Sequence, residues 1–348
     1  MESIKLIFRR PLYYSKFKCS ANKCKDNCCI GWEIDIDPYT LKKYMNINGE
    51  FGKRLKENIS NSSFILNQEE RCPFLNSKNL CDVYTELGED SLCQICTDHP
   101  RFYEWFGNIK EGGIGLCCEV SAKLIMSEDF SLTESIILED ESDYPNELLF
   151  NFLNDARQII IKHLSTDHDF MNLIGCLISF TEKLQSCIDN EIYTTPKWES
   201  VIVPQYPDIK LILSLFTELE PINEDWIPYI HNSMKLADNF NGYRIEDEVY
   251  LRRIAIYFIY RYFLKGVFDG EILSKVKLSI LSTWVIAYLW KCNAHSNFEN
   301  MVEIAKDYSK EIEYCTENLE TLYDAFYTEE FLSSNSLLGL FSLNNNNQ

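Results

Sequence analysis

The residues of this sequence best suited to chemistry are its cysteines. Ten of the 14 fall within the first 118 residues. Cys24 and Cys28 are four positions apart, so on a helical turn their sulfurs would share one face, whereas the adjacent Cys28 and Cys29 would point apart. Cys93-x2-Cys96 places two thiolates within reach of one metal. This crowding predicts thiolate ligation of zinc or of an iron–sulfur cluster. The ten are Cys19, Cys24, Cys28, Cys29, Cys72, Cys81, Cys93, Cys96, Cys117 and Cys118.

These thiols exceed the four ligands of a single tetrahedral zinc, so the sequence allows either two metal sites or one site with additional thiols. Uncoordinated buried thiols and disulfides formed under oxidative stress are the alternatives, and the density of cysteines favours metal binding over both. His99 could add a nitrogen ligand, although an interior or capping histidine is the more common arrangement. The four scattered cysteines are expected to be ordinary buried residues: Cys176, Cys187, Cys292 and Cys315.

Charge excludes two classes of partner. The net charge of −20 argues against binding to nucleic acid, which needs a basic surface, and to an anionic membrane. The chain is neutral through Lys123, so the whole imbalance lies beyond that residue. The start, Met1–Phe17, lacks the continuous apolar core of a signal peptide, and the longest apolar run, Leu278–Trp290, is too short to span a bilayer. A cytoplasmic protein with reduced cysteines is therefore expected.

Two kinds of sequence follow one another along the chain. From Cys19 to Lys123 turn residues are frequent and periodicity is weak, as in domains that a metal organises. Apolar residues then recur at three and four positions, the period of amphipathic helices. We predict a mainly α protein: a small irregular cysteine-rich metal-binding domain at 1–126, an acidic all-helical domain at 127–343 and a disordered tail at 344–348. Helices are expected near 149–164, 168–190, 208–219, 225–240, 246–268, 273–292 and 297–330.

Several cysteine motifs resemble those of the flagellin lysine-N-methylases, within the wider group of zinc- or iron-chelating cysteine-domain proteins. The resemblance covers about the first 125 residues, and the helical remainder resembles the family only in kind. The last motif departs from the family's Leu-Ser-Cys-Pro-Glu, so that Cys118 takes the family cysteine position and Cys117 is additional. The motifs are Phe17-Lys18-Cys19 with Cys24 and Cys28-Cys29-x2-Trp32, Cys72-Pro73-Phe74-Leu75, Leu80-Cys81, Leu92-Cys93-x2-Cys96, His99-Pro100-Arg101 and Leu116-Cys117-Cys118.

The resemblance implies S-adenosylmethionine-dependent methylation of surface lysines on flagellin. It also implies a [4Fe–4S] cluster, with zinc as the alternative metal. The family reads Tyr-Pro-Arg where this chain has His99-Pro100-Arg101, which weakens a ligand role for His99. The implied ligands come from the set Cys19, Cys24, Cys28, Cys29, Cys72, Cys81, Cys93, Cys96 and Cys118.

Methyl transfer to a lysine requires a neutral amine, so the site must lower the amine's pKa or supply a base. Glu33 and Asp35 are candidate bases, although their alternation with isoleucines is typical of the solvated face of a strand. Trp32 could contact a cationic cofactor, or simply pack. Arg101 could hold a cofactor carboxylate, or form a structural ion pair. The radical spacing CxxxCxxC is absent, because Cys28 is followed directly by another cysteine, and this favours polar transfer.

A second function remains open at this point. The protein could be a non-enzymatic zinc- or iron-chelating protein whose metal folds the N-terminal domain and whose helices bind a protein partner. The surplus of thiols would also suit metal storage or delivery. The acidic helical part could dock a lysine-bearing substrate protein, or merely provide a solvated surface.

Overall fold

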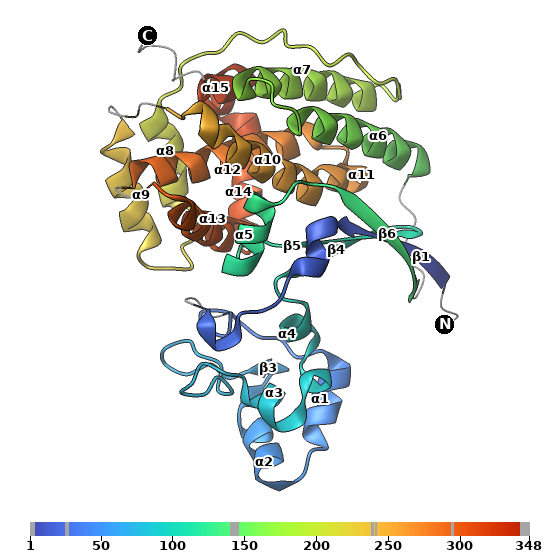
Figure 1. Ribbon diagram of the computed structural model, residues 1–348, viewed down its shortest axis with the longest axis vertical. Helices are drawn as coiled ribbons and strands as arrows, with labels where there is room; N and C mark the ends of the chain where they lie inside the picture. Colours follow the sequence, from blue (N-terminus) through green and yellow to red (C-terminus); the bar gives the residue numbers. More distant parts are fainter. Residues whose placement is uncertain are drawn as a thin grey trace.

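The chain folds into a large lobe and a small lobe, each with its own hydrophobic core (Figure 1). The large lobe is formed by residues 4–17 and the described parts of 101–341, and the small lobe by residues 28–99. The cores thus divide the chain near residues 17 and 101 rather than at the boundary between 126 and 127 that the sequence indicated. The computed structural model describes residues 4–24, 28–139, 146–237, 240, 242–293 and 296–341.

A four-stranded mixed sheet in the order β4-β5-β1-β6 forms one side of the large lobe. β1 runs parallel to β5, with Ile7 opposite Ile109, while β6 and β4 are antiparallel to their neighbours. The sequence interpretation missed this sheet, because strands that lie far apart in the chain show no common local signal. The strands are β1 (Ile4–Pro11), β4 (Arg101–Phe106), β5 (Ile109–Ile114) and β6 (Leu132–Glu139).

A row of ion pairs connects the strands β1, β5 and β6 to one of the helices. Arg9 on β1 lies between Glu111 on β5 and Glu134 on β6, its partners in the strand register. Arg157, which lies on the first long helix and is only 1% exposed, donates two hydrogen bonds of 2.5 and 2.7 Å to the Glu111 carboxylate. Each buried charge is therefore paired and hydrogen-bonded, as low-polarity surroundings require.

Helices form most of the large lobe and confirm the predicted mainly α class. Several begin at Asp or Asn side chains that accept a backbone N–H in the first turn, such as Asn146, Asp169, Asp208 and Asn297. The longer helices are α5 (Glu119–Ser127), α6 (Glu147–Leu164), α7 (Phe170–Asp189), α8 (Ile209–Glu218), α9 (Trp226–Met234), α10 (Glu248–Tyr262), α12 (Ile272–Cys292), α13 (Phe298–Glu313) and α14 (Thr316–Thr328). Shorter turns are η1 (Leu12–Lys16), η5 (Ile245–Asp247), η6 (Phe263–Lys265), α11 (Gly266–Asp269), η7 (Glu330–Leu332) and α15 (Ser334–Gly339).

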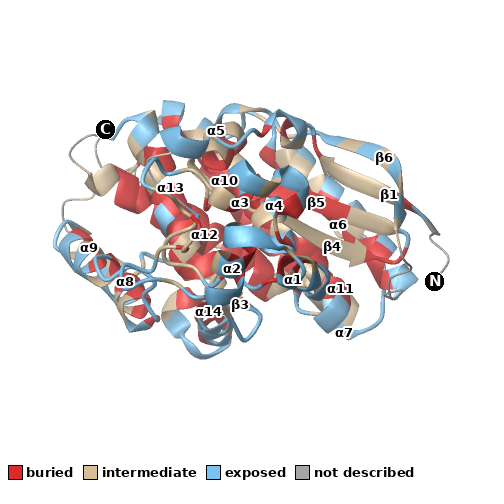
Figure 2. Cartoon of the chain, turned by 90° about the horizontal axis from the view of Figure 1, so that it is seen from below, coloured by how far each residue is buried: buried red, intermediate tan, exposed pale blue. Residues whose placement is uncertain are grey.

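The helix α12 lies at the centre of the large lobe. It packs against α7, α10, α13 and α14, and Figure 2 shows buried residues gathered along it. By length and composition α12 is apolar enough to cross a membrane. However, 94% of its apolar stretch is buried inside the protein. The apolar character of α12 is thus accounted for by core packing on all sides.

The predicted helices agree with the structure except in three places. The helix expected at 225–240 ends earlier, at Met234, the last residue of α9 (Trp226–Met234). The single helix expected at 297–330 is two helices, α13 and α14, because the chain turns at Tyr314 and Cys315. The segment 246–268 is divided among η5, α10, η6 and α11. The predicted disordered tail at 344–348 lies outside the described residues.

The small lobe is built from short elements joined by turns, as the sequence predicted. Its core contains few side chains, chiefly Tyr44, Leu55, Phe64 and Phe74, around which the cysteines are packed. Such a core supplies limited burial energy, which is typical of domains that need a metal or a cross-link. The elements are α1 (Pro38–Met45), α2 (Gly49–Glu57), β2 (Ile59–Ser60), β3 (Ser63–Phe64), α3 (Asp82–Leu87), η3 (Glu89–Ser91) and α4 (Gln94–Asp98), and η2 (Ala21–Lys23) lies in the connection to the large lobe.

Candidate functional site

Five cysteines from four separate segments of the small lobe converge, and we call them the thiol centre: Cys29, Cys72, Cys81, Cys93 and Cys96. The Sγ atoms of Cys93 and Cys96 lie 3.4 Å apart. The Cys96 thiol also interacts electrostatically with Cys29 and Cys72, and Cys72 interacts with Cys81. Cys28 extends the thiol centre through a hydrogen bond with its neighbour Cys29. All 14 cysteines are described and none is in a disulfide.

Backbone N–H groups point at the sulfurs of the thiol centre. Cys81 and Cys93 are the N-cap residues of α3 and α4, so their sulfurs lie beside the N–H groups of those first turns, although neither side chain makes a capping hydrogen bond. The Cys72 sulfur accepts the N–H groups of Phe74 and Leu75 in the Cys-Pro-Phe-Leu turn. Helix N-termini and convergent N–H groups favour the thiolate form, so the local backbone is arranged for negatively charged sulfur.

Burial acts against the charged thiolates. Desolvation is the main cause that raises the pKa of Cys72, to about 11. A hydrogen bond with Cys93, followed by burial, raises the pKa of Cys96 well above its usual range. Several buried thiols can become anionic together only with a cation beside them, which is the role of a bound metal. Among the described residues, no three His, Cys, Asp or Glu side chains are spaced to hold a single metal ion.

The other predicted ligands lie apart from the thiol centre. Cys118 is the N-cap residue of α5 in the large lobe. Burial raises the pKa of its thiol, and the nearby thiol of Cys24 adds to this effect. The Sγ of Cys19 is exposed and accepts the N–H of Ala21 at 3.3 Å. The helical turn considered for Cys24 and Cys28 falls on residues 25–27, which lie outside the described part of the chain. Four later cysteines, expected to be buried, are instead partly exposed: Cys176, Cys187, Cys292 and Cys315.

Three aromatic side chains meet where the two lobes join, and we call them the joint rings: Trp32, His99 and Tyr314. The ring centroids of Trp32 and Tyr314 are 5.1 Å apart, in an edge-to-face arrangement. His99 lies 6.1 Å from Trp32 and 6.4 Å from Tyr314. Trp32 and His99 belong to the small lobe, whereas Tyr314 follows α13 of the large lobe.

A buried polar network surrounds Glu313, the residue that precedes Tyr314. Its centre is the Glu313 carboxylate, which is 0% exposed and lies 3.2 Å from the Arg261 guanidinium. Tyr257, Tyr262 and Ser309 donate hydrogen bonds to the same carboxylate at 2.6 to 3.1 Å. The sequence interpretation did not identify this network. The sequence hint for it was Arg261, one of several charged residues that interrupt the otherwise apolar segment 249–268.

The non-cysteine residues singled out in the sequence lie in three different settings. Glu33 and Asp35 are exposed while Ile34 and Ile36 are buried, and Asp35 accepts a hydrogen bond of 2.6 Å from the Ser63 hydroxyl. This is the alternation of a half-buried extended segment. The Arg101 guanidinium lies over the rings of Phe17 and Tyr14, at 5.0 and 5.6 Å, and donates to the Thr97 carbonyl. Trp32 is among the joint rings.

Asp37 connects the first helix of the small lobe to the segment that carries Cys93. Its carboxylate accepts the N–H of Thr40, capping α1, and the N–H of Gln94 at the start of α4. Burial acts to raise the pKa of Asp37, but the two backbone hydrogen bonds outweigh it and hold the pKa below its usual value.

The Asp37→Ala variant should lose about 1 kcal/mol of unfolding free energy at neutral pH, the typical value of a helix cap. Because the folded-state pKa is depressed, this stabilisation is present above the unfolded-state value of about 3.9 and is lost as the pH falls through the folded-state pKa. Urea unfolding at a series of pH values from 7 downward should therefore show the two chains converging in acid, below the unfolded-state pKa. Asp37→Asn is the control that retains a capping oxygen, and an equal loss for both variants would contradict this assignment.

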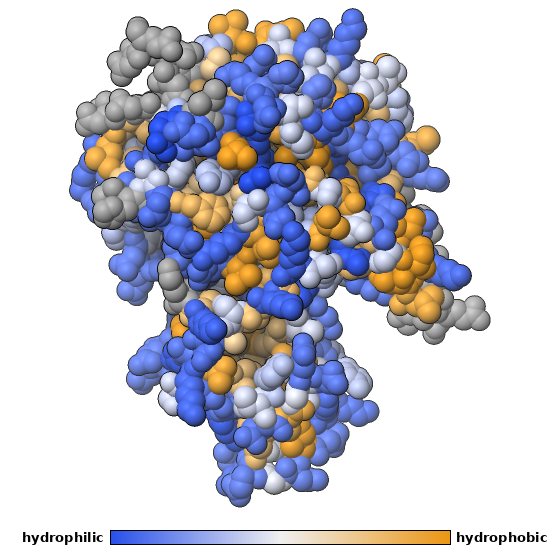
Figure 3. Space-filling model, in the orientation of Figure 1, coloured by the Kyte–Doolittle hydropathy of each residue, from blue (hydrophilic) through white to orange (hydrophobic). Residues whose placement is uncertain are grey.

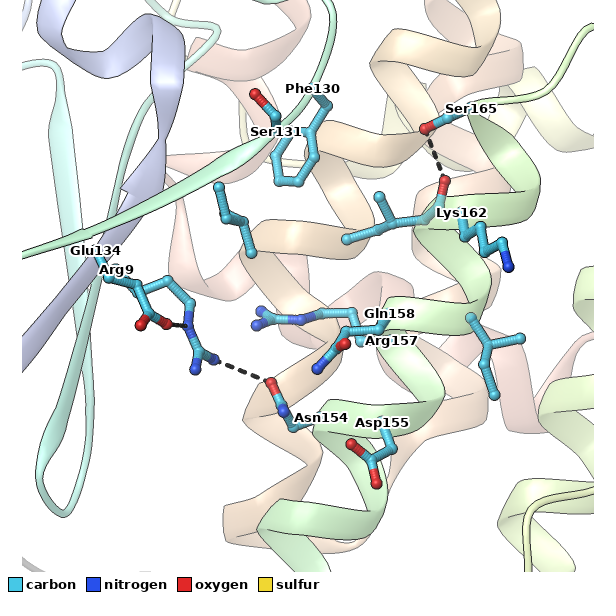
Figure 4. Close-up of a pocket in the computed structure, with 13 residues that line it drawn as sticks. Arg9, Phe130, Ser131, Glu134, Asn154, Asp155, Arg157, Gln158, Lys162 and Ser165 are labelled. Atoms are coloured by element: carbon cyan, nitrogen blue, oxygen red, sulfur yellow. Dashed lines mark hydrogen bonds and ion pairs between the residues drawn. The ribbon is translucent and has the colours of Figure 1, made fainter.

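A surface cavity of about 740 Å³ lies between α6 and the strands β1 and β6 (Figure 4). Its two arginines are already paired: Arg9 donates to Glu134 and to Asn154, and Arg157 to Glu111. None of the residues that line the cavity is a predicted ligand or cofactor contact. The cavity therefore marks the packing of sheet against helix rather than the centre of the chemistry.

Comparison with known proteins extends the likeness beyond the cysteine motifs. A family model described as the FliB lysine N-methylase C-terminal domain matches residues 147–340, so the helical part, expected to resemble the family only in kind, matches it directly. The lysine-N-methylase of Salmonella typhimurium is 30% identical over 141 residues, 37% of this chain and 35% of that protein. The lysine-N-methylase of Salmonella choleraesuis matches at the same identity and coverage.

A third relative, the flagellar biosynthetic protein FliU of Salmonella muenchen, is 31% identical over 130 residues, 34% of this chain and 77% of that protein. The chain thus spans about a third of the length of the two lysine-N-methylases that it matches. No solved structure matches the chain. Since the family model covers more than half of the sequence, the chain belongs to the FliB lysine N-methylase family.

Proposed function

We propose that this protein is an S-adenosylmethionine-dependent methyltransferase that methylates the ε-amine of lysines on the surface of flagellin, in the cytoplasm. The observation that carries the proposal is membership of the FliB lysine N-methylase family through the helical lobe. The relative named as a flagellar biosynthetic protein supports a flagellar substrate.

The thiol centre supports a [4Fe–4S] cluster as the bound metal group. A [4Fe–4S] cluster takes four thiolates, or three when one iron stays open, and the centre provides Cys29, Cys72, Cys81, Cys93 and Cys96, with Cys28 beside them. A single zinc ion gathers its donors around one atom, whereas an iron–sulfur core spreads them over several irons. Five converging thiols exceed the four donors that one zinc ion takes, and no three of the described His, Cys, Asp or Glu side chains are spaced for a single ion, so the second arrangement is favoured and zinc is the alternative.

When bound, a cluster with one open iron would coordinate the amino and carboxylate groups of the methyl donor. The neutral lysine nitrogen then attacks the methyl carbon, the carbon–sulfur bond breaks, and the electron pair remains on the sulfur as a thioether. The proton lost from the amine passes to a carboxylate or to water. Glu33 and Asp35, exposed on the small lobe, are the candidate acceptors, and Arg101 and Trp32 the candidate cofactor contacts.

Charge supports a lysine-bearing partner for the large lobe. The whole net charge of −20 lies beyond Lys123, in residues that mostly form the helices. A negative surface attracts a basic segment during encounter and increases the association rate, and added salt weakens that attraction.

Anaerobic purification followed by a methylation assay tests this proposal. We expect the brown colour and broad absorbance of an iron–sulfur protein, and transfer of labelled methyl groups from S-adenosylmethionine to purified flagellin. Flagellin whose lysines have been acetylated is the matched control and should accept no label. A colourless zinc protein that transfers no methyl group would instead establish the non-enzymatic scaffold.

A further inference from the structure

We propose that the joint rings Trp32, His99 and Tyr314 form a binding site for an organic cation at the junction of the two lobes. The inference rests on the proposed function, because methylation of lysine by S-adenosylmethionine involves two organic cations. One is the sulfonium of the methyl donor, and the other is the ammonium form in which the acceptor lysine arrives, before it loses the proton that must leave ahead of methyl transfer. Aromatic ring faces attract both kinds of charge.

The three rings come from segments that are distant in the sequence. Trp32 follows the first cysteine motif, His99 follows α4, and Tyr314 ends α13. Their centroids are 5.1 to 6.4 Å apart, and each ring is only partly buried, so ring surface stays accessible at the junction. Figure 3 shows the constriction between the lobes, with apolar atoms amid a largely hydrophilic surface.

The chain itself places an ammonium ion over one of these rings, Trp32. The Lys310 ammonium on α13 lies 5.9 Å from the centroid of Trp32, within the range of a cation–π contact. The face of Trp32 is thus compatible with a primary ammonium ion in a folded chain. A methyl donor or an acceptor lysine would present the same kind of charge to the same ring.

The joint rings lie close to the thiol centre along the chain. Trp32 is three residues beyond Cys29, and His99 is three residues beyond Cys96. Three residues span at most about 10 Å, so two of the rings lie at the edge of the place where the methyl donor would be held. This position suits a contact with the reacting end of the donor or with the incoming amine.

The large lobe holds Tyr314 in place. Its hydroxyl accepts a hydrogen bond of 3.0 Å from the Cys117 thiol, and the Arg261 guanidinium lies 5.4 Å from its ring. Glu313 pairs with Arg261 at 3.2 Å and offsets the positive charge, which would otherwise repel a second cation. At Gly115 a Cβ atom would come within 2.8 Å of the Tyr314 hydroxyl, so only glycine permits this close approach. The ring is therefore preorganised before any ligand binds.

Ligand charge provides the test. We would measure the dissociation constants of S-adenosylmethionine, which carries a sulfonium, and of S-adenosylhomocysteine, its neutral thioether, for the intact holoprotein and for Trp32→Leu. If the sulfonium occupies the joint rings, Trp32→Leu should weaken S-adenosylmethionine binding by about 3- to 30-fold and leave the thioether unchanged. Trp32→Phe should lie between the two, since it retains a ring.

A second measurement covers the acceptor lysine. If the ammonium occupies the site instead, Trp32→Leu should raise KM for flagellin while kcat and the ratio of the two cofactor affinities stay unchanged. If neither the affinity ratio nor KM changes, the proposal is overturned. Tyr314→Leu and Tyr314→Phe repeat the test from the large lobe in case Trp32→Leu does not fold.

The control is Trp198→Leu, which removes a tryptophan that stacks on His163 in the large lobe, at 4.4 Å, and contacts none of the joint rings. It should leave both affinities and KM unchanged. The outcomes also separate this inference from the proposed function. Suppose that the wild-type protein prefers the sulfonium, that Trp32→Leu abolishes this preference, and that the wild-type protein nevertheless methylates nothing. The cation site would then be supported and the proposed activity refuted.

Discussion

Cys93→Ser, purified without oxygen, is expected to contain about one tenth of the iron of the native chain or less. Its methyl-transfer activity should be lost together with the iron. Cys93 is 1% exposed, occupies the N-cap position of α4 and has its sulfur 3.4 Å from that of Cys96, so it lies inside the thiol centre. Serine keeps the size of the side chain but replaces a soft sulfur with a hard oxygen that binds iron and zinc poorly.

The small lobe should lose its structure with the metal. Its core contains few large side chains, so metal binding supplies a substantial part of the folding free energy. Limited proteolysis of Cys93→Ser should cut within residues 28–99 and leave the helices of the large lobe intact. Treatment of the native chain with a chelator under reducing conditions should produce the same fragments.

The matched control is Cys187→Ser, which changes a partly exposed cysteine on α7 of the large lobe. Iron content, methyl transfer and the proteolysis pattern should all match those of the native chain. Native iron content in Cys93→Ser would show that this sulfur is not a ligand. The metal would then have to be bound by the other four cysteines of the thiol centre.

Arg261→Met is expected to reduce the unfolding free energy by about 3–5 kcal/mol, the usual cost of leaving a buried charge without its partner. The Glu313 carboxylate is 0% exposed and would lose the guanidinium 3.2 Å away. Tyr257 would lose the hydrogen bond of 2.7 Å that Arg261 donates to its hydroxyl. The hydrogen bonds from Tyr257, Tyr262 and Ser309 would remain but cannot neutralise the carboxylate.

Urea unfolding followed by circular dichroism at 222 nm measures this loss. Lys183→Met, which breaks the exposed ion pair with Glu199 on the same lobe, is the control and should cost about 0–1 kcal/mol. The double variant Arg261→Met with Glu313→Leu should recover most of the loss, because it removes both buried charges. Equal stability of Arg261→Met and Lys183→Met would show that the network contributes nothing beyond a surface pair.

The helices of the large lobe could be predicted because their signals are local. Residues such as Leu149, Leu153 and Ile160 recur at the helical period and are buried in the structure. The break at Tyr314 was missed, because no proline or glycine marks it. The sheet was missed for another reason. β1 pairs with β5 and β6 across about a hundred residues, and pairing over such separations depends on the packed fold.

The cysteine motifs predicted a common thiol site, and the structure brings five of the nine predicted ligands together with a sixth beside them. It leaves Cys19, Cys24 and Cys118 outside that centre. Spacing along the chain could not separate these groups, because the loops between the motifs decide which sulfurs face one another. Glu33 and Asp35 were correctly interpreted as the exposed side of an extended segment, since alternation is visible in the sequence.

Sequence alone identifies the kind of chemistry and the kind of fold, because thiol ligands, helical periods and net charge are properties of residue type and spacing. Only the tertiary structure brings Trp32 and His99 against Tyr314, and Arg261 against Glu313. These partners lie on different elements and, for the rings, on different lobes. Whether they meet depends on how those elements pack, and no local pattern in the chain records that outcome.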